Sequence, residues 1–315
     1  MSTAFIFPGQ GSQAVGMGRA VYDASPAARA IFEAADATLG FALTALCFEG
    51  PADALTATEN AQPAILTASL ALLAALAERA GAADGPAFVA QRAACVAGHS
   101  LGEYTALVAA GALPLGAALR LVRRRGELMA AAHEGGMAAI IGLEEPTLEA
   151  VCREAAAPGE PVVIANYNTP DQLVISGASA AVERAMELAK ARGARRALPL
   201  KVSAAFHSPL MQAAADGLAP LLADAPLADA RVPLIANVDA RPLTAAAALR
   251  AELAAQVAAP VRWTAGVRRM LADGVEMFVE VGPGSVLTGL VRRIAPDARL
   301  VNVSDLAGVE ALLGA

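Results

Sequence analysis

The residues with the most evident chemistry surround Ser100, in the run Gly98-His99-Ser100-Leu101-Gly102. This is the G-x-S-x-G pattern, in which a serine stands at a sharp turn between a strand and a helix. Glycines two residues to either side let neighbouring backbone approach without a Cβ, and the first N–H groups of the helix point to where an oxyanion would develop. The alternative interpretation is a glycine-bounded turn that happens to contain a serine.

The flanking residues predict the elements that such a serine needs. Residues 94–97 form a short apolar run typical of a buried strand, and residues 103–110 are typical of a helix that ends before Gly111 and Pro114. This strand-turn-helix context favours a catalytic serine over a chance match.

A serine is a weak nucleophile at neutral pH and needs a base within hydrogen-bond reach, and the chain has three histidines. His99 lies directly beside the serine in sequence, and adjacent side chains on a tight turn usually diverge, so it is a poor base. His133 lies at the end of a predicted helix, where a capping or cationic role explains it. We therefore favour His207, in a loop before Ser208, as general base, with a structural loop histidine as the alternative. Because no acid between Ser100 and His207 lies at a strand end of the predicted main sheet, we expect a Ser-His dyad whose imidazole is oriented by a backbone carbonyl or an amide.

The composition is that of an aliphatic, weakly acidic protein. Hydrophobic residues make up 56% of the 315 residues but aromatic residues only 4%, and the net charge of −6 argues against a nucleic-acid partner. Cys47, Cys95 and Cys152 are far apart in apolar surroundings, which indicates reduced buried thiols and not disulfides or metal ligands. The most apolar run, 64–77, is shorter than the ~20 residues of a membrane span, and the N-terminus shows no signal peptide. We expect a cytoplasmic protein that uses no metal or other cofactor and contacts no membrane.

The order of the predicted elements divides the chain into two parts. Between residues 135 and 201 it is β-α-β-β-α-β, the ferredoxin-like unit. Before and after this unit, strands and helices alternate, which implies a parallel sheet covered on both faces. We predict an α/β fold in which residues 1–134 and 202–315 form one discontinuous catalytic subdomain and residues 135–201 an inserted small one. The strands expected in the insertion are 137–141, 162–165, 172–176 and 196–200; in the larger part we expect helices such as 63–79, 115–132 and 246–257 and strands at 234–238, 277–281 and 299–303.

Five motifs together resemble those of malonyl-CoA:acyl carrier protein transacylases. They appear in the order of that family and cover nearly the whole chain: Phe7-Pro8-Gly9-Gln10-Gly11-Ser12-Gln13, Gly98-His99-Ser100-Leu101-Gly102-Glu103-Tyr104, Arg125-Gly126, Ala205-Phe206-His207-Ser208 and Val281-Gly282-Pro283-Gly284. The resemblance implies a hydrolase-like α/β core with a ferredoxin-like insertion, in agreement with the predicted element order.

The resemblance also implies roles for individual residues. Ser100 would be the nucleophile and His207 the general base, with the backbone N–H groups of Gln10 and Leu101 as the oxyanion hole. Arg125 matches the arginine that holds the malonyl carboxylate, which suits a guanidinium because it binds carboxylates bidentately and keeps its charge.

The resemblance also includes two residues near the catalytic histidine. Gln256 matches the family's glutamine near the catalytic histidine, where the orienting group is main chain. Phe206, directly before the histidine, resembles the malonyl-selective form of the motif. In the family, a smaller residue at this position is linked with bulkier acyl groups.

The implied reaction moves a malonyl group from malonyl-CoA to the phosphopantetheine thiol of acyl carrier protein through a malonyl-serine intermediate, supplying fatty acid synthesis. Carrier proteins of this kind are acidic, and Arg195, Arg196 and Lys201 belong to a basic cluster at the edge of the insertion. The cluster is either a docking surface for carrier protein or CoA, or a solvated helix end and strand start. We expect a monomer.

Other activities share parts of this pattern. A serine esterase or thioesterase would use the same serine and histidine but end in hydrolysis, and an acyltransferase of a polyketide or malonate decarboxylase system would use another carrier. A non-catalytic carrier-binding module would form no acyl adduct on Ser100.

Overall fold

A six-stranded sheet forms the centre of the larger part of the chain in the computed structural model, which describes residues 2–202 and 204–314. In spatial order its strands are β10 (Arg299–Val303), β9 (Met277–Val281), β1 (Thr3–Phe7), β2 (Cys95–Gly98), β7 (Leu234–Ile235) and β8 (Pro242–Leu243). The pairs from β10 to β7 are parallel, and β8 pairs with β7 antiparallel. A parallel core sheet is therefore confirmed, with one antiparallel strand at its edge.

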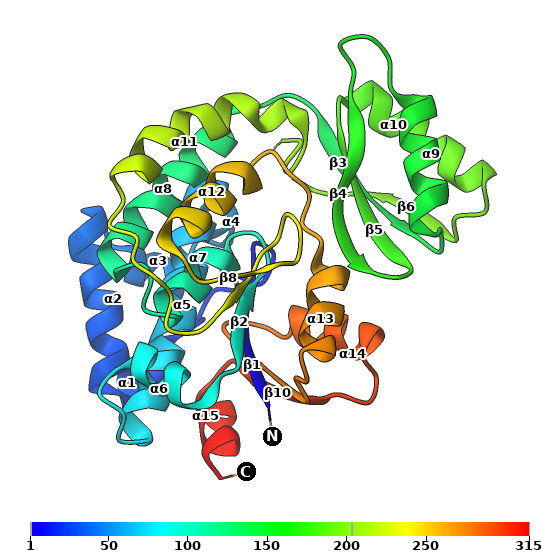
Figure 1. Cartoon of the computed structure of the whole chain (residues 1–315). Coiled ribbons are helices and arrows are strands. Elements are labelled where there is room, and N and C mark those ends of the chain that lie inside the picture. Colours follow the sequence, from blue (N-terminus) through cyan, green and yellow to red (C-terminus); the bar gives the residue numbers. More distant parts are fainter. Residues whose placement is uncertain (1, 203, 315) are drawn as a thin grey trace.

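Helices cover both faces of this sheet (Figure 1). Phe5 and Phe7 of β1 point into one apolar cluster, whereas Ala4 and Ile6 point into another, so β1 is buried on both sides as a strand between two helical layers must be. The helices of the core are α1 (Arg19–Ala24), α2 (Pro26–Leu39), α3 (Leu43–Glu49), α4 (Ala52–Thr56), α5 (Thr58–Arg79), α6 (Gly85–Arg92), α7 (Gly102–Ala109), α8 (Leu115–Ala131), a short 3-10 helix (Pro209–Met211), α11 (Gln212–Asp224), α12 (Ala246–Gln256), α13 (Trp263–Ala272), α14 (Val286–Ile294) and α15 (Leu306–Leu313).

The insertion forms a separate antiparallel sheet, seen in green beside the core in Figure 1. Its elements follow as β3 (Gly136–Ile141), α9 (Glu145–Ala155), β4 (Val162–Thr169), β5 (Gln172–Gly177), α10 (Ser179–Ala191) and β6 (Arg196–Pro199), with the spatial order β4-β5-β3-β6. The predicted ferredoxin-like order is confirmed. Side chains of both helices and of the sheet form an apolar cluster of their own.

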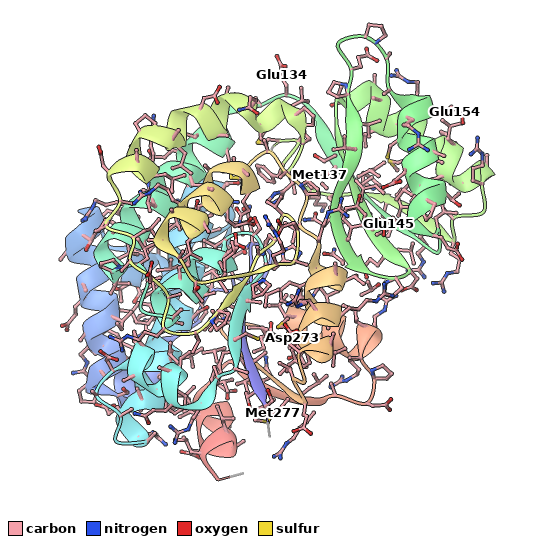
Figure 2. All side chains as sticks on the ribbon, in the orientation of Figure 1. Glu134, Met137, Glu145, Glu154, Asp273 and Met277 are labelled. Carbon is pink, nitrogen blue, oxygen red and sulfur yellow. The ribbon has the colours of Figure 1, made fainter. Side chains whose placement is uncertain are left out.

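The connection from α8 into the insertion passes through Glu134, labelled in Figure 2. The limits 135–201 stay a prediction, supported by the separate apolar cluster of the insertion. Residues 1, 203 and 315 of the predicted larger subdomain lie outside the described residues.

The prediction of a strand over 234–238 is wrong beyond Ile235. The backbone N–H of Asn237 donates to Glu103 Oε1 (2.9 Å) and that of Val238 to Glu252 Oε1 (2.9 Å). Because buried carboxylates bind these N–H groups, the chain leaves the sheet at this point.

Strand β4 is longer than the predicted 162–165 and reaches Thr169, with register irregularities on the way. The polar residues that follow Ala165 in the sequence are typical of a loop. In the structure, however, Tyr167 N donates to Val261 O (2.9 Å) and Val261 N to Ala165 O (2.8 Å), so that the segment pairs with the core as well as with β5. Tertiary pairing outweighs the turn signal here.

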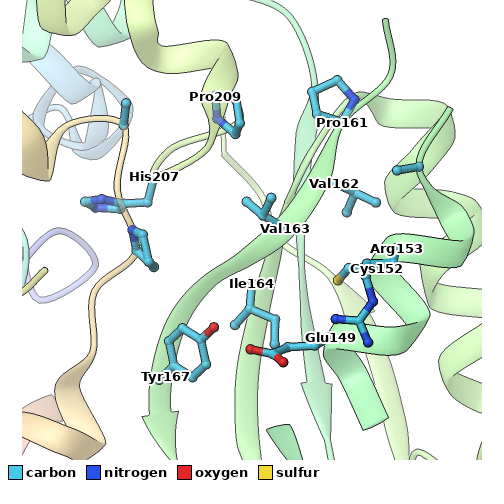
Figure 3. Close-up of a pocket in the computed structure, with 13 residues that line it drawn as sticks. Glu149, Cys152, Arg153, Pro161, Val162, Val163, Ile164, Tyr167, His207 and Pro209 are labelled. Atoms are coloured by element: carbon cyan, nitrogen blue, oxygen red, sulfur yellow. The ribbon is translucent and has the colours of Figure 1, made fainter. Parts of the chain in front are cut away.

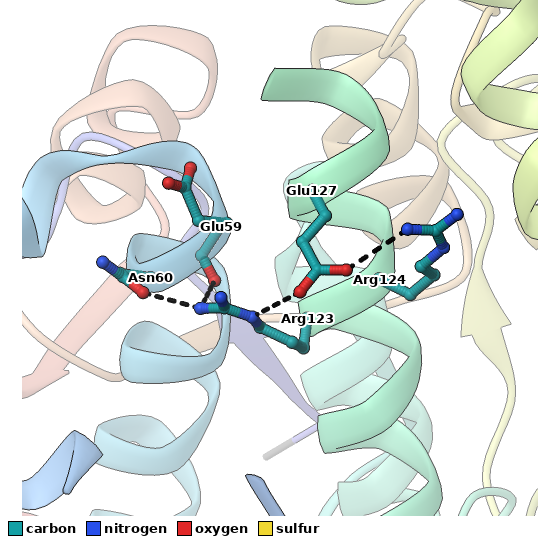
Figure 4. A network of polar contacts seen from close by, with 5 residues as sticks. All are labelled: Glu59, Asn60, Arg123, Arg124 and Glu127. Carbon is teal, nitrogen blue, oxygen red and sulfur yellow. Dashed lines mark hydrogen bonds and ion pairs between the residues drawn. The ribbon is translucent and has the colours of Figure 1, made fainter. Parts of the chain in front are cut away.

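Helix α5 begins at Thr58, earlier than the predicted start at Pro63. A proline in a helix leaves the carbonyl four residues before it without its N–H donor. That carbonyl belongs to Glu59, and it accepts from Arg123 Nη1 instead (3.2 Å), within the network of Figure 4. Helix α8 also crosses closely at Gly126, where a Cβ would lie 2.6 Å from Glu59 Cα. These contacts fix α8 against α5, the two helices that carry Arg125 and Gln62.

By length and composition α5 is also the one helix among the described residues that is long and apolar enough to cross a membrane, but 89% of its apolar window lies inside the protein. Such burial is expected of the central helix of an α/β core, and the length alone is weak evidence for a membrane span.

Candidate active site

Ser100 lies at the corner between β2 and α7 with a positive φ of 50°, an unusual conformation for a non-glycine residue. A Cβ on Gly98 would lie 1.9 Å from the carbonyl carbon of Gly102, and a Cβ on Gly102 would lie 2.1 Å from Phe7 O. Both glycines are therefore required by close backbone approach, for the reason that the sequence pattern indicates.

The glycine-rich loop after β1 packs against this corner. A Cβ on Gly9 would lie 2.4 Å from His99 O, and Gln10 is held by a hydrogen bond from its Nε2 to Thr58 Oγ1 (3.2 Å). Gln10 and Leu101 line the same cavity as Ser100. Within residues 2–202 and 204–314, the backbone N–H groups of Gln10 and Leu101 have no acceptor. They are available to a ligand oxygen.

His207 is the histidine that the structure brings to Ser100, with 2.7 Å between its Nε2 and Ser100 Oγ. Its Nδ1 lies 3.0 Å from the backbone oxygens of both Gln256 and Ala259. Carbonyl oxygens only accept, so Nδ1 carries the proton and Nε2 is the acceptor that faces the serine hydroxyl. Main-chain carbonyls orient the imidazole, as in the dyad that we expect.

The imidazole is neutral over most of the pH range. Burial, together with the charges of Arg125 and His99, lowers the pKa of His207 to about 3, although the two carbonyl acceptors oppose the shift. A neutral imidazole is the form that can take a proton from serine.

The other two histidines lie apart from this contact. His99 Nε2 lies 3.0 Å from Asn168 Oδ1, and its ring packs near Trp263. His133 is exposed after the end of α8.

Arg125 lies beside the serine and is almost fully buried, with 1% of its surface exposed. Its Nη2 donates to Ser100 Oγ (2.9 Å) and to Gln256 Oε1 (3.0 Å), and its Nη1 donates to Gln62 Oε1 (2.8 Å). Burial lowers the pKa of Arg125, yet a guanidinium stays protonated in proteins. Neutral amides hold it, and among the described residues no carboxylate forms an ion pair with it.

The neighbouring arginines on α8 behave differently. Arg124 is exposed and Arg123 half-buried, and both bind Glu127, as Figure 4 shows. Of this group, Arg125 is the one that the tertiary structure turns inward.

The residues of the site line a cavity of about 220 Å³, together with Met137, Phe206 and Lys201. A second cavity, of about 610 Å³, lies on the other side of His207 between α9, β4 and the loop before Val261. Figure 3 shows that the His207 ring points away from this second cavity. The smaller cavity is therefore the one that holds the reactive groups.

Three polar residues of the site were not identified from the sequence. Gln62 binds Arg125, Asn237 Oδ1 accepts from Ser100 N (2.8 Å), and Glu103 binds both Asn237 and Gln256. Glu103 did carry a signal, since it is a charged residue inside an otherwise apolar helical run. Gln62 and Asn237 have no such signal in their own neighbourhoods.

The three predicted docking residues lie at the surface. Arg195 binds Asp171 through Nη2 (2.7 Å), Arg196 is exposed, and Lys201 lines the mouth of the small cavity. Only Lys201 among the three lines the cavity of the serine.

The fold and the site together define a class. In this α/β protein a strained serine, a neutral histidine and two N–H groups without an acceptor in the described part of the chain face a buried arginine, the arrangement of a serine-dependent acyl-group transfer. The acyl transferase domain model matches residues 4–310, and the malonyl CoA-acyl carrier protein transacylase of Bacillus subtilis (strain 168) is 46% identical over 310 residues, 98% of this chain and 95% of that protein. The chain belongs to this acyl transferase family, among the malonyl CoA-acyl carrier protein transacylases.

Solved structures of malonyl transacylases have the same fold as this chain. The malonyl CoA-acyl carrier protein transacylase of Coxiella burnetii has a TM-score of 0.93 and 39% identity, with 100% of this chain and 97% of that one covered. A malonyl-transacylase solved in complex with its type II PKS acyl-carrier protein also has a TM-score of 0.93, with 41% identity over 100% of this chain and 99% of that one.

Proposed function

We propose that this enzyme transfers a malonyl group from malonyl-CoA to the phosphopantetheine thiol of an acyl carrier protein, through a malonyl ester on Ser100, and supplies fatty acid synthesis. The observation that carries the proposal is the buried guanidinium of Arg125, 2.9 Å from Ser100 Oγ and without an ion-pair partner among the described residues. A buried cation without a direct ion pair, beside a nucleophile, favours an acyl group that carries a carboxylate.

In the first half-reaction, Ser100 Oγ attacks the thioester carbonyl while its proton passes to His207 Nε2, across the 2.7 Å contact. The N–H groups of Gln10 and Leu101 stabilise the oxyanion. The carbon–sulfur bond then breaks, and His207 gives the proton to the departing CoA thiolate.

The second half-reaction reverses these roles. The carrier thiol loses its proton to His207 and attacks the ester carbonyl, and His207 returns the proton to Ser100 Oγ as the carbon–oxygen bond breaks. Arg125 holds the malonyl carboxylate during both steps. A fixed acyl group lets the long pantetheine arm reach the ester in one orientation, which favours the thiol over water.

The cavity residues support a preference for the malonyl group. Phe206 and Met137 both line the small cavity, and their bulk restricts the space for an acyl group with a branch next to the thioester. A methylmalonyl group would need that space.

The basic residues at the edge of the insertion provide the proposed docking surface. Lys201 at the mouth of the cavity and the exposed Arg196 would attract an acidic carrier or the phosphates of CoA. We keep the monomeric state, the cytoplasmic location and the independence from cofactors as predictions.

A carrier of type II polyketide synthesis is the second candidate. The solved relative that binds such a carrier is 41% identical to this chain over its whole length. A fatty acid carrier and a polyketide carrier would both accept the malonyl group from Ser100 by the same reaction.

Mass spectrometry of the intact protein tests the proposal. We expect malonyl-CoA to add one malonyl group to Ser100, acetyl-CoA and methylmalonyl-CoA to load far less, and addition of a fatty acid or type II polyketide carrier to remove the adduct and malonylate that carrier. The Ser100→Ala variant is the control that should take no adduct. Release of free malonate without carrier malonylation would identify a thioesterase, and absence of an adduct on the folded wild type would leave only a binding module.

A further inference from the structure

Glu103 lies beneath the site, in the first turn of α7, with none of its surface exposed. Both carboxylate oxygens accept hydrogen bonds: Oε1 from the backbone N–H of Asn237 (2.9 Å) and Oε2 from Gln256 Nε2 (2.6 Å). A buried carboxylate is costly unless its hydrogen-bonding capacity is used. Here the partners that use it are the residues that hold the site.

The first partner fixes the serine corner. Asn237 Oδ1 accepts from the backbone N–H of Ser100 (2.8 Å), and Asn237 Nδ2 donates to Gly98 O (2.7 Å). The amide therefore bridges the end of β2 and the strained residue that follows it. Glu103 in turn fixes the backbone of Asn237.

The second partner fixes the base and the guanidinium. Gln256 Nε2 donates to Ser100 O (2.8 Å) as well as to Glu103, and its Oε1 accepts from Arg125 Nη2 (3.0 Å). Its main-chain oxygen accepts from His207 Nδ1 (3.0 Å). One residue thus contacts Ser100, Arg125 and His207, and its amide orientation is set by Glu103.

The carboxylate does this without neutralising the arginine. The amide of Gln256 stands between Glu103 and Arg125, and among the described residues these two charges form no direct ion pair. Burial and the nearby Glu252 raise the pKa of Glu103, while the N–H donors and the Arg125 charge oppose that shift. The guanidinium keeps its orientation and remains available to an anionic acyl group.

We propose that Glu103 is a positioning residue for acyl transfer, which through Asn237 and Gln256 sets the geometry of Ser100, His207 and Arg125. The inference rests on the proposed malonyl transfer for its choice of substrate. Its structural content, the alignment of the serine with the histidine, does not depend on which acyl group is transferred.

The isosteric change Glu103→Gln separates this role from packing. A glutamine offers one oxygen and one NH₂ group to two N–H donors, so one of the two contacts must be lost. If Gln256 turns its amide to accept from the new NH₂, it no longer donates to Ser100 O or accepts from Arg125. We expect kcat/KM for malonyl-CoA to fall about 10²-fold, as misplacements of about 1 Å can cause, and kcat/KM for acetyl-CoA to fall less.

Glu280→Gln is the matched control. Glu280 is equally buried, and its oxygens accept from the N–H groups of Leu287 (3.0 Å) and Thr288 (2.7 Å), at the start of α14. The same chemical change should lower the melting temperature in both variants. We expect the control to keep both kcat/KM values within about twofold of the wild type, because this carboxylate holds no residue of the site.

A second variant and a second probe complete the test. Glu103→Asp keeps the charge but is one methylene shorter, so we expect partial activity and a partly restored malonyl-to-acetyl ratio.

Phenylmethylsulfonyl fluoride modifies an activated serine without any acyl-CoA, and we expect Glu103→Gln to slow this modification of Ser100. Folded Glu103→Gln with wild-type rates, or Glu280→Gln with an equal loss, would overturn the positioning role. If Glu103→Gln slows sulfonylation but the wild type takes no malonyl group, the proposed function alone would be rejected and the positioning role would stand.

Discussion

The core and the insertion differ in what they bury. Among the described residues, the buried charged or histidine residues all belong to the core: Glu103, Arg125, His207, Glu252 and Glu280. The interior of the insertion is an apolar cluster with a few neutral polar groups. Its charges form exposed ion pairs on the outer surface, such as Arg192 with Glu154, which is labelled in Figure 2.

This difference separates two kinds of electrostatic effect. Water screens the exposed pairs of the insertion, so each contributes at most about 1 kcal/mol. The core excludes water, and a hydrogen bond or charge there has a larger effect on its neighbours. We infer that the core carries the chemistry, whereas the insertion supplies one wall of the cavity and a surface for weak, salt-sensitive recognition.

The largest expected effect comes from removing the buried cation. Arg125→Ala should lower kcat/KM for malonyl-CoA by roughly 10²- to 10³-fold, because truncating one partner of a buried charged contact costs about 2–5 kcal/mol. Loading of acetyl-CoA should be kept or improved. Steady-state kinetics with both thioesters measures the ratio of the two kcat/KM values. Normal malonyl transfer by a folded Arg125→Ala variant would contradict the assignment of Arg125 as the group that binds the acyl carboxylate.

The pH dependence sharpens the same comparison. His207 must be neutral to act as a base, and burial together with Arg125 lowers its pKa from 6.5 to about 3. The rate of Ser100 sulfonylation should therefore stay constant well below pH 6.5, and its half-point should move upward in Arg125→Ala, which lacks the repelling charge. Far-UV circular dichroism at each pH checks folding, and a wild-type half-point near 6.5 would mean that the imidazole is not desolvated.

The same shift affects stability, with a definite sign. The unfolded chain binds the proton of His207 below pH 6.5, whereas the folded chain does so only near pH 3. The contribution of this histidine to the free energy of unfolding should therefore fall as the pH drops from 6.5 toward 3.

The smallest expected effect lies on the insertion. The double variant Arg196→Ala/Lys201→Ala should raise KM for the carrier by about fivefold at low salt, a difference that salt should reduce. Serine loading by malonyl-CoA should change less. Arg29→Ala/Arg120→Ala, which removes two exposed charges from α2 and α8, is the control with the same change in net charge. An equal loss in both variants would mean that net charge alone governs the encounter.

The sequence by itself determined the local features of this protein. The glycines around Ser100, the alternation of strands and helices and the β-α-β-β-α-β order all depend on residues that are neighbours in the chain, and these predictions of fold are confirmed. His207 was favoured by eliminating the two other histidines, which works because few candidates existed. The assignment of Arg125, Gln10 and Gln256 came from the resemblance of five motifs and not from spacing.

Only the tertiary structure decided which polar groups meet in the core. The contact of Asn237 with Ser100 spans 137 residues and that of Arg125 with Gln62 spans 63, and neither is marked by any local pattern. The early end of β7 has a related origin, because carboxylates of Glu103 on α7 and Glu252 on α12 bind the next N–H groups. Local sequence fixes backbone conformation through sterics and periodicity, but a buried polar group finds its partners only when the elements have packed and water has left.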